Sequence, residues 1–137
     1  MVKEFNVVGA ILIKDKQILS CQRGPGRALN GYWEFPGGKI EPGETARQAL
    51  QRELEEELKI EVEVAANVFV QSTYEYEFGR VKLQTFLCRL ITGTPMLTEH
   101  INVDWFKPTA LAQLNFAPVD VATAEKLIQL GDQHEFF

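Results

Sequence analysis

Short apolar runs recur along most of the chain, and they indicate β-strands. Each run is rich in Val, Ile or aromatic residues and is bounded by turn-forming residues, as is typical of strands. The pattern predicts strands over residues 5–13, 17–22, 33–35, 61–65, 68–77, 81–91 and 103–106. Lys14-Asp15-Lys16 and Phe78-Gly79-Arg80 separate neighbouring runs and predict hairpins. Pro36-Gly37-Gly38 is expected to interrupt the extended chain.

Two segments show the period of an amphipathic helix. Residues 45–58 begin with Thr45 and Gln48, which have the spacing of a capping box. Residues 118–130 open with a proline, carry an apolar stripe and stop before a glycine, and residues 109–114 suggest a short helical turn. One buried sheet with two such helices predicts an α/β fold with a mixed β-sheet between helices.

The chain has 137 residues, which predicts a single domain over residues 1–137. Its 14 basic and 19 acidic residues give a net charge of −5, so it has no bulk attraction for a nucleic-acid duplex. The longest apolar stretch, residues 7–13, is too short to span a membrane, and the first residues lack the pattern of a secretory leader. Cys21 and Cys88 match no metal or redox spacing and are expected to be free and buried. We therefore expect a cytoplasmic protein with no nucleic-acid and no membrane partner.

The predicted first helix carries an unusual cluster of glutamates. At about 100° per residue, its leucines form one arc, and Glu53 and Glu57 fall inside that arc. Glu56 lies at the edge of the arc with Arg52 beside it. Carboxylates are rarely turned toward a core without a partner, and one arginine cannot neutralise three of them. A divalent metal ion that prefers carboxylate oxygens, Mg²⁺ or Mn²⁺, resolves this conflict.

The loop before this helix suits an anionic ligand. Gly37 and Gly38 allow a close approach of the backbone, and the N-terminus of a helix favours anions. Lys39 adds a cation next to the glycines. Together with the carboxylates, the loop predicts a site where a metal ion and a phosphate group meet.

The segment 38–60 resembles the signature of the Nudix hydrolases. It reads Gly38, five residues, Glu44, seven residues, then Arg52-Glu53-Leu54, any residue, Glu56-Glu57, two residues and Ile60. It departs at Lys59, where the family usually has a glycine that ends the helix. Residues 7–13, 22–23, 33–39, 74–78 and 116–120 are similar to the MutT-like branch, so the resemblance covers nearly the whole chain.

The resemblance implies an α/β/α sandwich and a Mg²⁺-dependent hydrolase, with Mn²⁺ as a possible substitute. In the MutT-like branch, water splits a (deoxy)nucleoside triphosphate into a monophosphate and pyrophosphate. The family pattern assigns the metal to Glu53, Glu56, Glu57, the Gly37 carbonyl and Glu99. It also assigns Glu53 as the first choice of general base, with Glu99 as the second candidate, and gives Arg52 and Glu44 the role of orienting the carboxylates.

The same resemblance predicts the substrate-binding side. Arg23 and Asp120 match positions that touch the nucleobase in this branch. Phe35 can stack on a base, although a core role is an equally good interpretation. The remaining candidates for contact with substrate are Glu34, Gly38, Lys39 and, at the hairpin tip, Arg80. The alternation of Tyr74, Tyr76 and Phe78 with glutamates predicts that these aromatic residues face the core.

The choice of substrate stays open on sequence grounds. An ionised Asp120 only accepts hydrogen bonds, which favours guanine-type and cytosine-type bases over thymine and adenine. We expect sanitation of the nucleotide pool with oxidised guanine (8-oxo-dGTP) as the leading substrate, and a CTP or 5-methyl-dCTP type of pyrimidine nucleotide as the alternative. A dinucleoside polyphosphate hydrolase and a non-catalytic nucleotide-binding module are further alternatives. The absence of proline between Pro42 and Pro95 argues against an ADP-ribose hydrolase. We expect a monomer or a weak homodimer.

Overall fold

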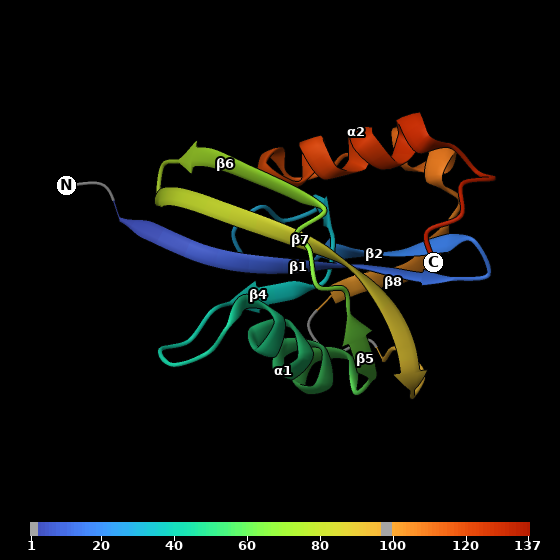
Figure 1. The fold of residues 1–137 in the computed structure, drawn as a ribbon. Coiled ribbons are helices and arrows are strands. Elements are labelled where there is room, and N and C mark those ends of the chain that lie inside the picture. Colours follow the sequence, from blue (N-terminus) through green and yellow to red (C-terminus); the bar gives the residue numbers. More distant parts are fainter. Residues whose placement is uncertain (1–2, 97–99) are drawn as a thin grey trace.

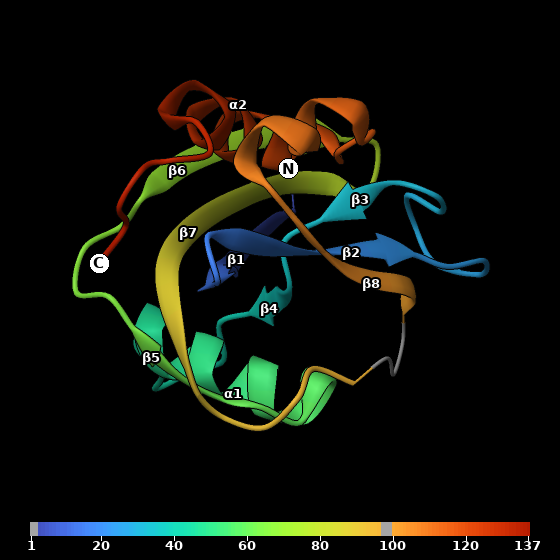
Figure 2. The same cartoon turned by 90° about the vertical axis from the view of Figure 1, so that its right-hand side faces the viewer.

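The fold is a twisted mixed sheet between two helical layers (Figures 1 and 2). The structure, a computed structural model, describes residues 3–96 and 100–137. Its strands are β1 (Glu4–Lys14), β2 (Gln17–Arg23), β3 (Trp33–Glu34), β4 (Gly37–Lys39), β5 (Glu61–Val64), β6 (Val70–Tyr76), β7 (Gly79–Thr92) and β8 (His100–Phe106). Its helical elements are α1 (Ala46–Leu58), α2 (Val121–Leu130) and two 3₁₀ turns, η1 (Pro108–Gln113) and η2 (Pro118–Asp120).

β1 is the central strand of the sheet. Along one edge it runs parallel to β7, and along the other edge it pairs antiparallel with β4 near its start and with β2 near its end. β7 also carries β5 and β6, and β2 also carries β3 and β8. Both faces of β1 are covered, so its residues Val8, Ala10, Ile11 and Leu12 are all buried. This explains why its sequence is continuously apolar rather than alternating.

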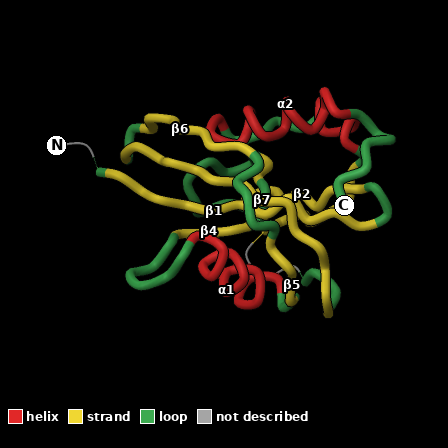
Figure 3. Tube along the Cα trace, in the orientation of Figure 1, coloured by secondary structure: helices red, strands yellow, loops and turns green. Residues whose placement is uncertain are grey.

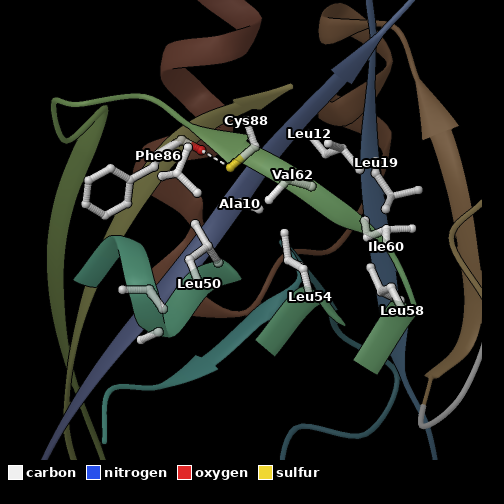
Figure 4. Close-up of a cluster of buried hydrophobic side chains, with 13 residues drawn as sticks. Ala10, Leu12, Leu19, Leu50, Leu54, Leu58, Ile60, Val62, Phe86 and Cys88 are labelled. Atoms are coloured by element: carbon white, nitrogen blue, oxygen red, sulfur yellow. Dashed lines mark hydrogen bonds between the residues drawn. The ribbon is translucent and has the colours of Figure 1, made fainter. Parts of the chain in front are cut away.

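The two helices cover opposite faces of the sheet, as Figure 3 shows with helices in red on both sides of the yellow strands. Leu50, Leu54 and Leu58 of α1 are fully buried against β1, β5 and β7 (Figure 4). On the other face, Leu127 of α2 packs with Ile11 of β1 and with the aromatic rings of the β3–β4 and η1–η2 regions. The predicted α/β/α sandwich with a mixed sheet is confirmed, whereas a single domain over residues 1–137 stays a prediction.

Local signals in the sequence place the element ends well. The capping box is present, because the Thr45 hydroxyl accepts from the Gln48 backbone N–H and the Gln48 side chain accepts from the Thr45 N–H. Lys59 ends α1 in the left-handed conformation (φ 59°), which explains why a glycine is favoured at this position. Cys21 and Cys88 are free and buried as predicted, and burial raises the pKa of Cys88 to about 12.

Three local predictions were wrong in part. The extended chain is interrupted at Phe35-Pro36, but Gly37 and Gly38 already belong to β4, which pairs with β1. The helix predicted from Pro118 opens with the 3₁₀ turn η2, and the α-helix begins only at Val121. The aromatic residues of β6 and its hairpin do not all face the core.

Tyr74 and Phe78 are 45% and 47% exposed. Tyr74 lies in β6 and Phe78 in the turn that follows it. β6 pairs with β7 alone and lies at the margin of the sheet, so alternation there does not lead to burial.

Candidate active site

The glutamates of α1 lie as the helical periodicity predicts. Leu54 is fully buried, and Glu53, the residue before it, keeps only 18% of its side chain exposed. Glu57 is half-buried and lines a cavity, whereas Glu56 at the edge of the arc is 62% exposed. α1 therefore directs Glu53 and Glu57 toward the space between the helix and the sheet.

Arg52 ties these carboxylates to the preceding loop. Its guanidinium binds Glu44 through two hydrogen bonds, Nε to Oε2 at 2.6 Å and Nη2 to Oε1 at 2.9 Å. Nη1 reaches Glu53 Oε1 at 3.0 Å and Glu56 Oε2 at 3.2 Å, and Nη2 also donates to the Lys39 carbonyl at 3.0 Å. One side chain thus fixes the relative positions of the α1 carboxylates and of the loop that precedes the helix.

The pKa values of Glu44 and Glu53, which both contact Arg52, are shifted in opposite directions. Hydrogen bonds from Arg52 and from the Glu41 backbone N–H hold the pKa of Glu44 below its usual range. The pKa of Glu53 is raised, because the loss of solvent outweighs the hydrogen bond and charge of Arg52, and neighbouring Glu56 adds to the rise. The ionised form of Glu53 is therefore less favoured than that of a free glutamate.

The two glycines before α1 are required by close packing. A Cβ on Gly37 would overlap the backbone carbonyl of Val8 in β1, and a Cβ on Gly38 would lie 2.5–2.6 Å from the Glu53 carboxylate oxygens. Gly37 thus lets β4 approach β1, and Gly38 lets Glu53 lie against β4. The sequence suggested a close approach of a ligand here, but in the structure the close neighbours are the chain's own groups.

A divalent cation suits the donors on α1. Within residues 3–96 and 100–137, no three acidic, histidine or cysteine side chains already converge on one point. However, Glu53, Glu56 and Glu57 share one end of the helix, and carboxylate oxygens are the ligands that Mg²⁺ and Mn²⁺ prefer. The absence of a side chain at Gly38 leaves room for the Glu53 carboxylate, which is consistent with a role of Glu53 as a metal ligand.

A cavity of about 390 Å³ connects this helix to the substrate-binding residues predicted from the sequence. Its wall includes the following predicted residues: Arg23, Glu34, Phe35, Gly37, Gly38, Lys39, Glu57 and Asp120. Residues from four separate stretches of the chain therefore meet around one space. Nucleotides of ordinary size fit a cavity of this volume.

Arg23 and Glu34 form an ion pair at one end of the cavity. Arg23 Nη1 lies 2.9 Å from Glu34 Oε1, and both side chains are less than one-fifth exposed. Arg23 Nε also donates to the Ala28 carbonyl at 2.7 Å, which fixes the loop between β2 and β3. The polar groups at this end are therefore held in place before any ligand arrives.

Asp120 lies in the same wall and is 5% exposed. Its Oδ1 accepts a hydrogen bond from the Phe35 backbone N–H at 3.3 Å, and its side chain does not cap α2. Burial, with the nearby charge of Glu34, raises the pKa of Asp120 well above its usual range. The raised pKa favours the neutral form more than in a free aspartate, and the interpretation of Asp120 as an ionised pure acceptor stays a prediction. A neutral carboxylic acid donates as well as accepts, as an asparagine does.

The remaining predicted residues have less direct positions. Phe35 is buried against Phe116 (ring centroids 5.0 Å apart), as a core role predicts, and it also lines the cavity; its stacking on a base stays a prediction. Lys39 lies over the Phe5 ring at 4.8 Å, at the cavity wall. Arg80 pairs with Glu75 at 2.6 Å and with Glu4 at 3.3 Å on the surface, and it does not line the cavity. Glu99 lies outside the described residues.

Several residues that line the cavity were not predicted from the sequence as substrate-binding residues. Phe5, Tyr76 and Phe78 line it, although the sequence marked two of them only as core residues of a strand. Arg27 also lines it, and its buried Nη1 has no hydrogen-bond partner in the described chain. A guanidinium in that position is available to an acceptor on a ligand. An arginine in a glycine-rich loop gives no sequence signal of this kind.

The class of protein follows from this fold and site together with the matching family model. The NUDIX domain model matches residues 3–127, and the chain belongs to the Nudix hydrolase family. Members of this family act on small nucleotide substrates and generally use divalent metal ions.

The similar proteins belong to the MutT-like branch. The chain is 39% identical to the CTP pyrophosphohydrolase of Escherichia coli, over 93% of this chain and 94% of that protein. It is 34% identical to the 8-oxo-dGTP diphosphatase of Haemophilus influenzae, over 99% of both chains. These relatives cleave phosphoanhydride bonds, so the chain is a Nudix hydrolase of this branch.

Solved structures agree with the fold. The MutT protein of the Nudix family from methicillin-resistant Staphylococcus aureus 252 has a TM-score of 0.78 and 42% identity, covering 96% of this chain and all of that one. The Escherichia coli ORF135 protein has a TM-score of 0.79 and 36% identity, covering 94% of this chain and 91% of that one. In the described part of this chain, no helix is long and apolar enough to cross a membrane.

Proposed function

We propose that this protein hydrolyses (deoxy)nucleoside triphosphates to the monophosphate and pyrophosphate in a Mg²⁺-dependent reaction. The cavity is the observation that carries this proposal, because it joins the partly buried Arg23 and the buried Asp120 to Gly37, Gly38 and Glu57 beside α1. A nucleotide can place its base against the first group and its phosphates against the second. The proposed role is cleaning of the nucleotide pool in the cytoplasm, by a monomer or a weak homodimer.

Glu53, Glu56 and Glu57, with the Gly37 carbonyl, would hold the metal ion, and Mn²⁺ would serve in place of Mg²⁺. Glu99 is a further proposed ligand. When bound, the metal ion offsets the phosphate charge, about −4 on a triphosphate, that an acidic protein would otherwise repel.

The side chains of the protein supply positioning and proton transfer. Attack of water on phosphorus needs little covalent chemistry from the protein, so orientation and charge dominate. Glu53 is the proposed base that accepts the proton of the attacking water, and Glu99 is the alternative base. Arg52 and Glu44 hold the Glu53 carboxylate in place through the hydrogen bonds described above.

The base end of the cavity recognises a pair of polar atoms. Phe35 N–H already occupies Asp120 Oδ1, and the raised pKa of Asp120 supports a protonated carboxyl, which would both donate and accept toward a ligand. The O6 and N7–H atoms of 8-oxoguanine offer the matching acceptor and donor, which supports oxidised guanine as the leading base. Phe35 gives the base an apolar surface, and Arg23 and Glu34 lie beside Asp120 in the wall. Lys39 and Gly38 are proposed to contact the phosphates, and Arg80 stays a prediction for substrate contact.

A cytosine-type substrate is the second candidate. The N3 and exocyclic amine of cytosine present the same acceptor and donor pair to a neutral Asp120. The similarity to a CTP pyrophosphohydrolase at 39% identity favours this candidate. A protonated Asp120 would not by itself exclude thymine or adenine.

A substrate panel with Mg²⁺ tests the proposal. It contains the normal and 8-oxo (d)NTPs, CTP, 5-methyl-dCTP, ADP-ribose and dinucleoside polyphosphates, and it quantifies the monophosphate and pyrophosphate released. We expect the highest kcat/KM for an 8-oxoguanine triphosphate, or for a cytosine triphosphate if the second candidate is right. Faster cleavage of a dinucleoside polyphosphate, or binding of nucleotides without turnover, contradicts the proposed reaction.

Asp120→Ala tests the pocket assignment separately. We expect this variant to flatten the order of kcat/KM among bases. An order that stays within about threefold of the wild type shows that Asp120 does not read the base.

A further inference from the structure

A pair of hydroxyl groups on β6 holds the backbone that carries Asp120. The backbone N–H of Val119 donates to the Tyr76 hydroxyl oxygen at 3.0 Å. The Ser72 hydroxyl donates to the Val119 carbonyl at 2.7 Å, and this carbonyl belongs to the peptide bond that leads into Asp120. Both bonds join residues more than forty positions apart, so they are tertiary contacts rather than part of a local turn.

These two hydrogen bonds hold the turn that carries Asp120, a residue of the cavity wall. η2, which ends at Asp120, is a single 3₁₀ turn with no side-chain cap, and its internal hydrogen bond runs from Asp120 N–H to the Ala117 carbonyl. β6 runs alongside α2 on the face of the sheet away from α1 (Figure 1). A short turn of this kind has few intrinsic restraints. The Ala117 N–H donates to the Trp33 carbonyl at 2.8 Å just before the turn, and the two β6 hydroxyls add hydrogen bonds to both backbone groups of Val119 within it.

Tyr76 combines this role with a place in the cavity wall. Its ring lines the same cavity as Asp120 and Phe35, and it stacks on Phe78 with centroids 5.0 Å apart and planes 5° apart. The stacked rings hold the hydroxyl in one position. Burial raises the pKa of Tyr76 to about 12, so its hydroxyl stays protonated and unchanged over the working pH range.

We propose that Tyr76, assisted by Ser72, is a positioning residue for base selectivity. Its hydroxyl fixes the Val119–Asp120 segment, so that the Asp120 carboxyl lies where it can form hydrogen bonds with the base. This inference rests on the proposed function, in which Asp120 contacts the base. Loss of the hydroxyl leaves the Val119 N–H without its partner and frees the turn. The Asp120 carboxyl then moves relative to Phe35, and bases that differ in one polar atom are distinguished less well.

Tyr76→Phe is the main test, because it removes one oxygen atom and keeps the ring. Tyr74→Phe is the matched control, since it removes a phenolic hydroxyl from the same face of β6 at a residue that is 45% exposed and outside the cavity wall. We expect Tyr76→Phe to lower the ratio of kcat/KM between the preferred and the least preferred base by about tenfold, and Tyr74→Phe to leave it within about twofold. Ser72→Ala, which changes no ring, should lower the same ratio.

A substrate without a base separates positioning from a general structural effect. Ribose triphosphate occupies the phosphate end alone, so its kcat should stay within about twofold of the wild type in Tyr76→Phe. Hydrogen exchange of the Val119 amide should accelerate in Tyr76→Phe and stay unchanged in Tyr74→Phe. An equal loss with every substrate, or an unchanged selectivity ratio, overturns the proposal.

The experiment also keeps this inference apart from the proposed function. Binding of nucleoside monophosphates, measured by calorimetry, gives the selectivity ratio even if the wild type cleaves no triphosphate. Lack of turnover in the wild type therefore contradicts the proposed reaction alone. Binding selectivity that falls in Asp120→Ala but stays at the wild-type value in Tyr76→Phe contradicts the positioning role alone.

Discussion

Gly38→Ala should inactivate the enzyme without unfolding it. The added Cβ would lie 2.5–2.6 Å from the two Glu53 carboxylate oxygens, well inside the distance at which carbon and oxygen normally touch. The backbone of Gly38 is not in the left-handed region, so alanine meets no conformational penalty there. The group in the way is the end of a side chain, which can rotate away.

The size of the effect follows from that displacement. The Glu53 carboxylate has to move by about 1 Å to reach ordinary contact with the new methyl group. A displacement of about 1 Å at a reacting or positioning group costs about 10²-fold in rate, which equals about 2.7 kcal/mol of activation free energy. The free energy of unfolding should change by less than about 1 kcal/mol, since alanine also restricts the unfolded chain.

Gly37→Ala is the matched comparison. Its Cβ would overlap the Val8 carbonyl, which belongs to the backbone of β1 and cannot rotate away. β4 would have to separate from β1, and the expected loss of stability is about 3 kcal/mol. Gly38→Ala should thus lower mainly the activity, and Gly37→Ala should lower the stability.

Steady-state kinetics with saturating Mg²⁺ and urea unfolding of both variants make the test. We expect a low kcat with near-normal stability for Gly38→Ala, and a clearly lower unfolding midpoint for Gly37→Ala. If Gly38→Ala keeps its kcat within about threefold of the wild type, the position of the Glu53 carboxylate does not matter for the reaction. The assignment of Glu53 as base and metal ligand then fails.

Three further predictions follow from the same contacts. Glu53→Gln and Glu57→Gln should each lower kcat by at least ~10²-fold in steady-state assays, while metal-free melting temperatures stay level or rise because like-charge repulsion is relieved. Asp120→Asn should gain stability over the wild type as pH rises: burial raises the folded pKa of Asp120, so its favourable contribution is complete below the unfolded pKa of about 3.9 and is lost as pH rises toward the folded pKa. Urea unfolding of both proteins between pH 4 and pH 8 measures the difference. Lys59→Gly should raise the free energy of unfolding by about 1 kcal/mol, because Lys59 ends α1 with a positive φ that glycine adopts without strain.

Each of these predictions has a result that contradicts it. A sharp fall in metal-free stability with normal kcat makes the glutamate pair structural. A constant stability difference between Asp120→Asn and the wild type from pH 4 to pH 8 shows that Asp120 is not buried as a neutral acid. An unchanged or lower unfolding midpoint in Lys59→Gly shows that the side chain of Lys59 contributes more than the strain of its backbone costs.

The apolar pattern and the order of charged residues were enough to predict most of the elements and the family. The periods of apolar residues predicted the long strands and α1, because both faces of β1 and one face of α1 have to be buried in any compact arrangement. The helical period also oriented Glu53 and Glu57 toward the sheet, since side-chain direction on a helix depends on spacing alone. The residue types and spacing of the segment from Gly38 to Ile60 were the main basis of the resemblance to the Nudix hydrolases.

The way in which distant segments meet depends on the packing of the whole fold. Arg23, Glu34 and Asp120 come from β2, β3 and η2, and no local pattern shows that they share one cavity wall. The protonation of Asp120 depends on its 5% exposure and on Glu34, which are properties of packing rather than of sequence. The pattern of alternation predicted that Tyr74 is buried, but Tyr74 is exposed. Alternation distinguishes the two faces of a strand, whereas the fold decides which of these faces other elements cover.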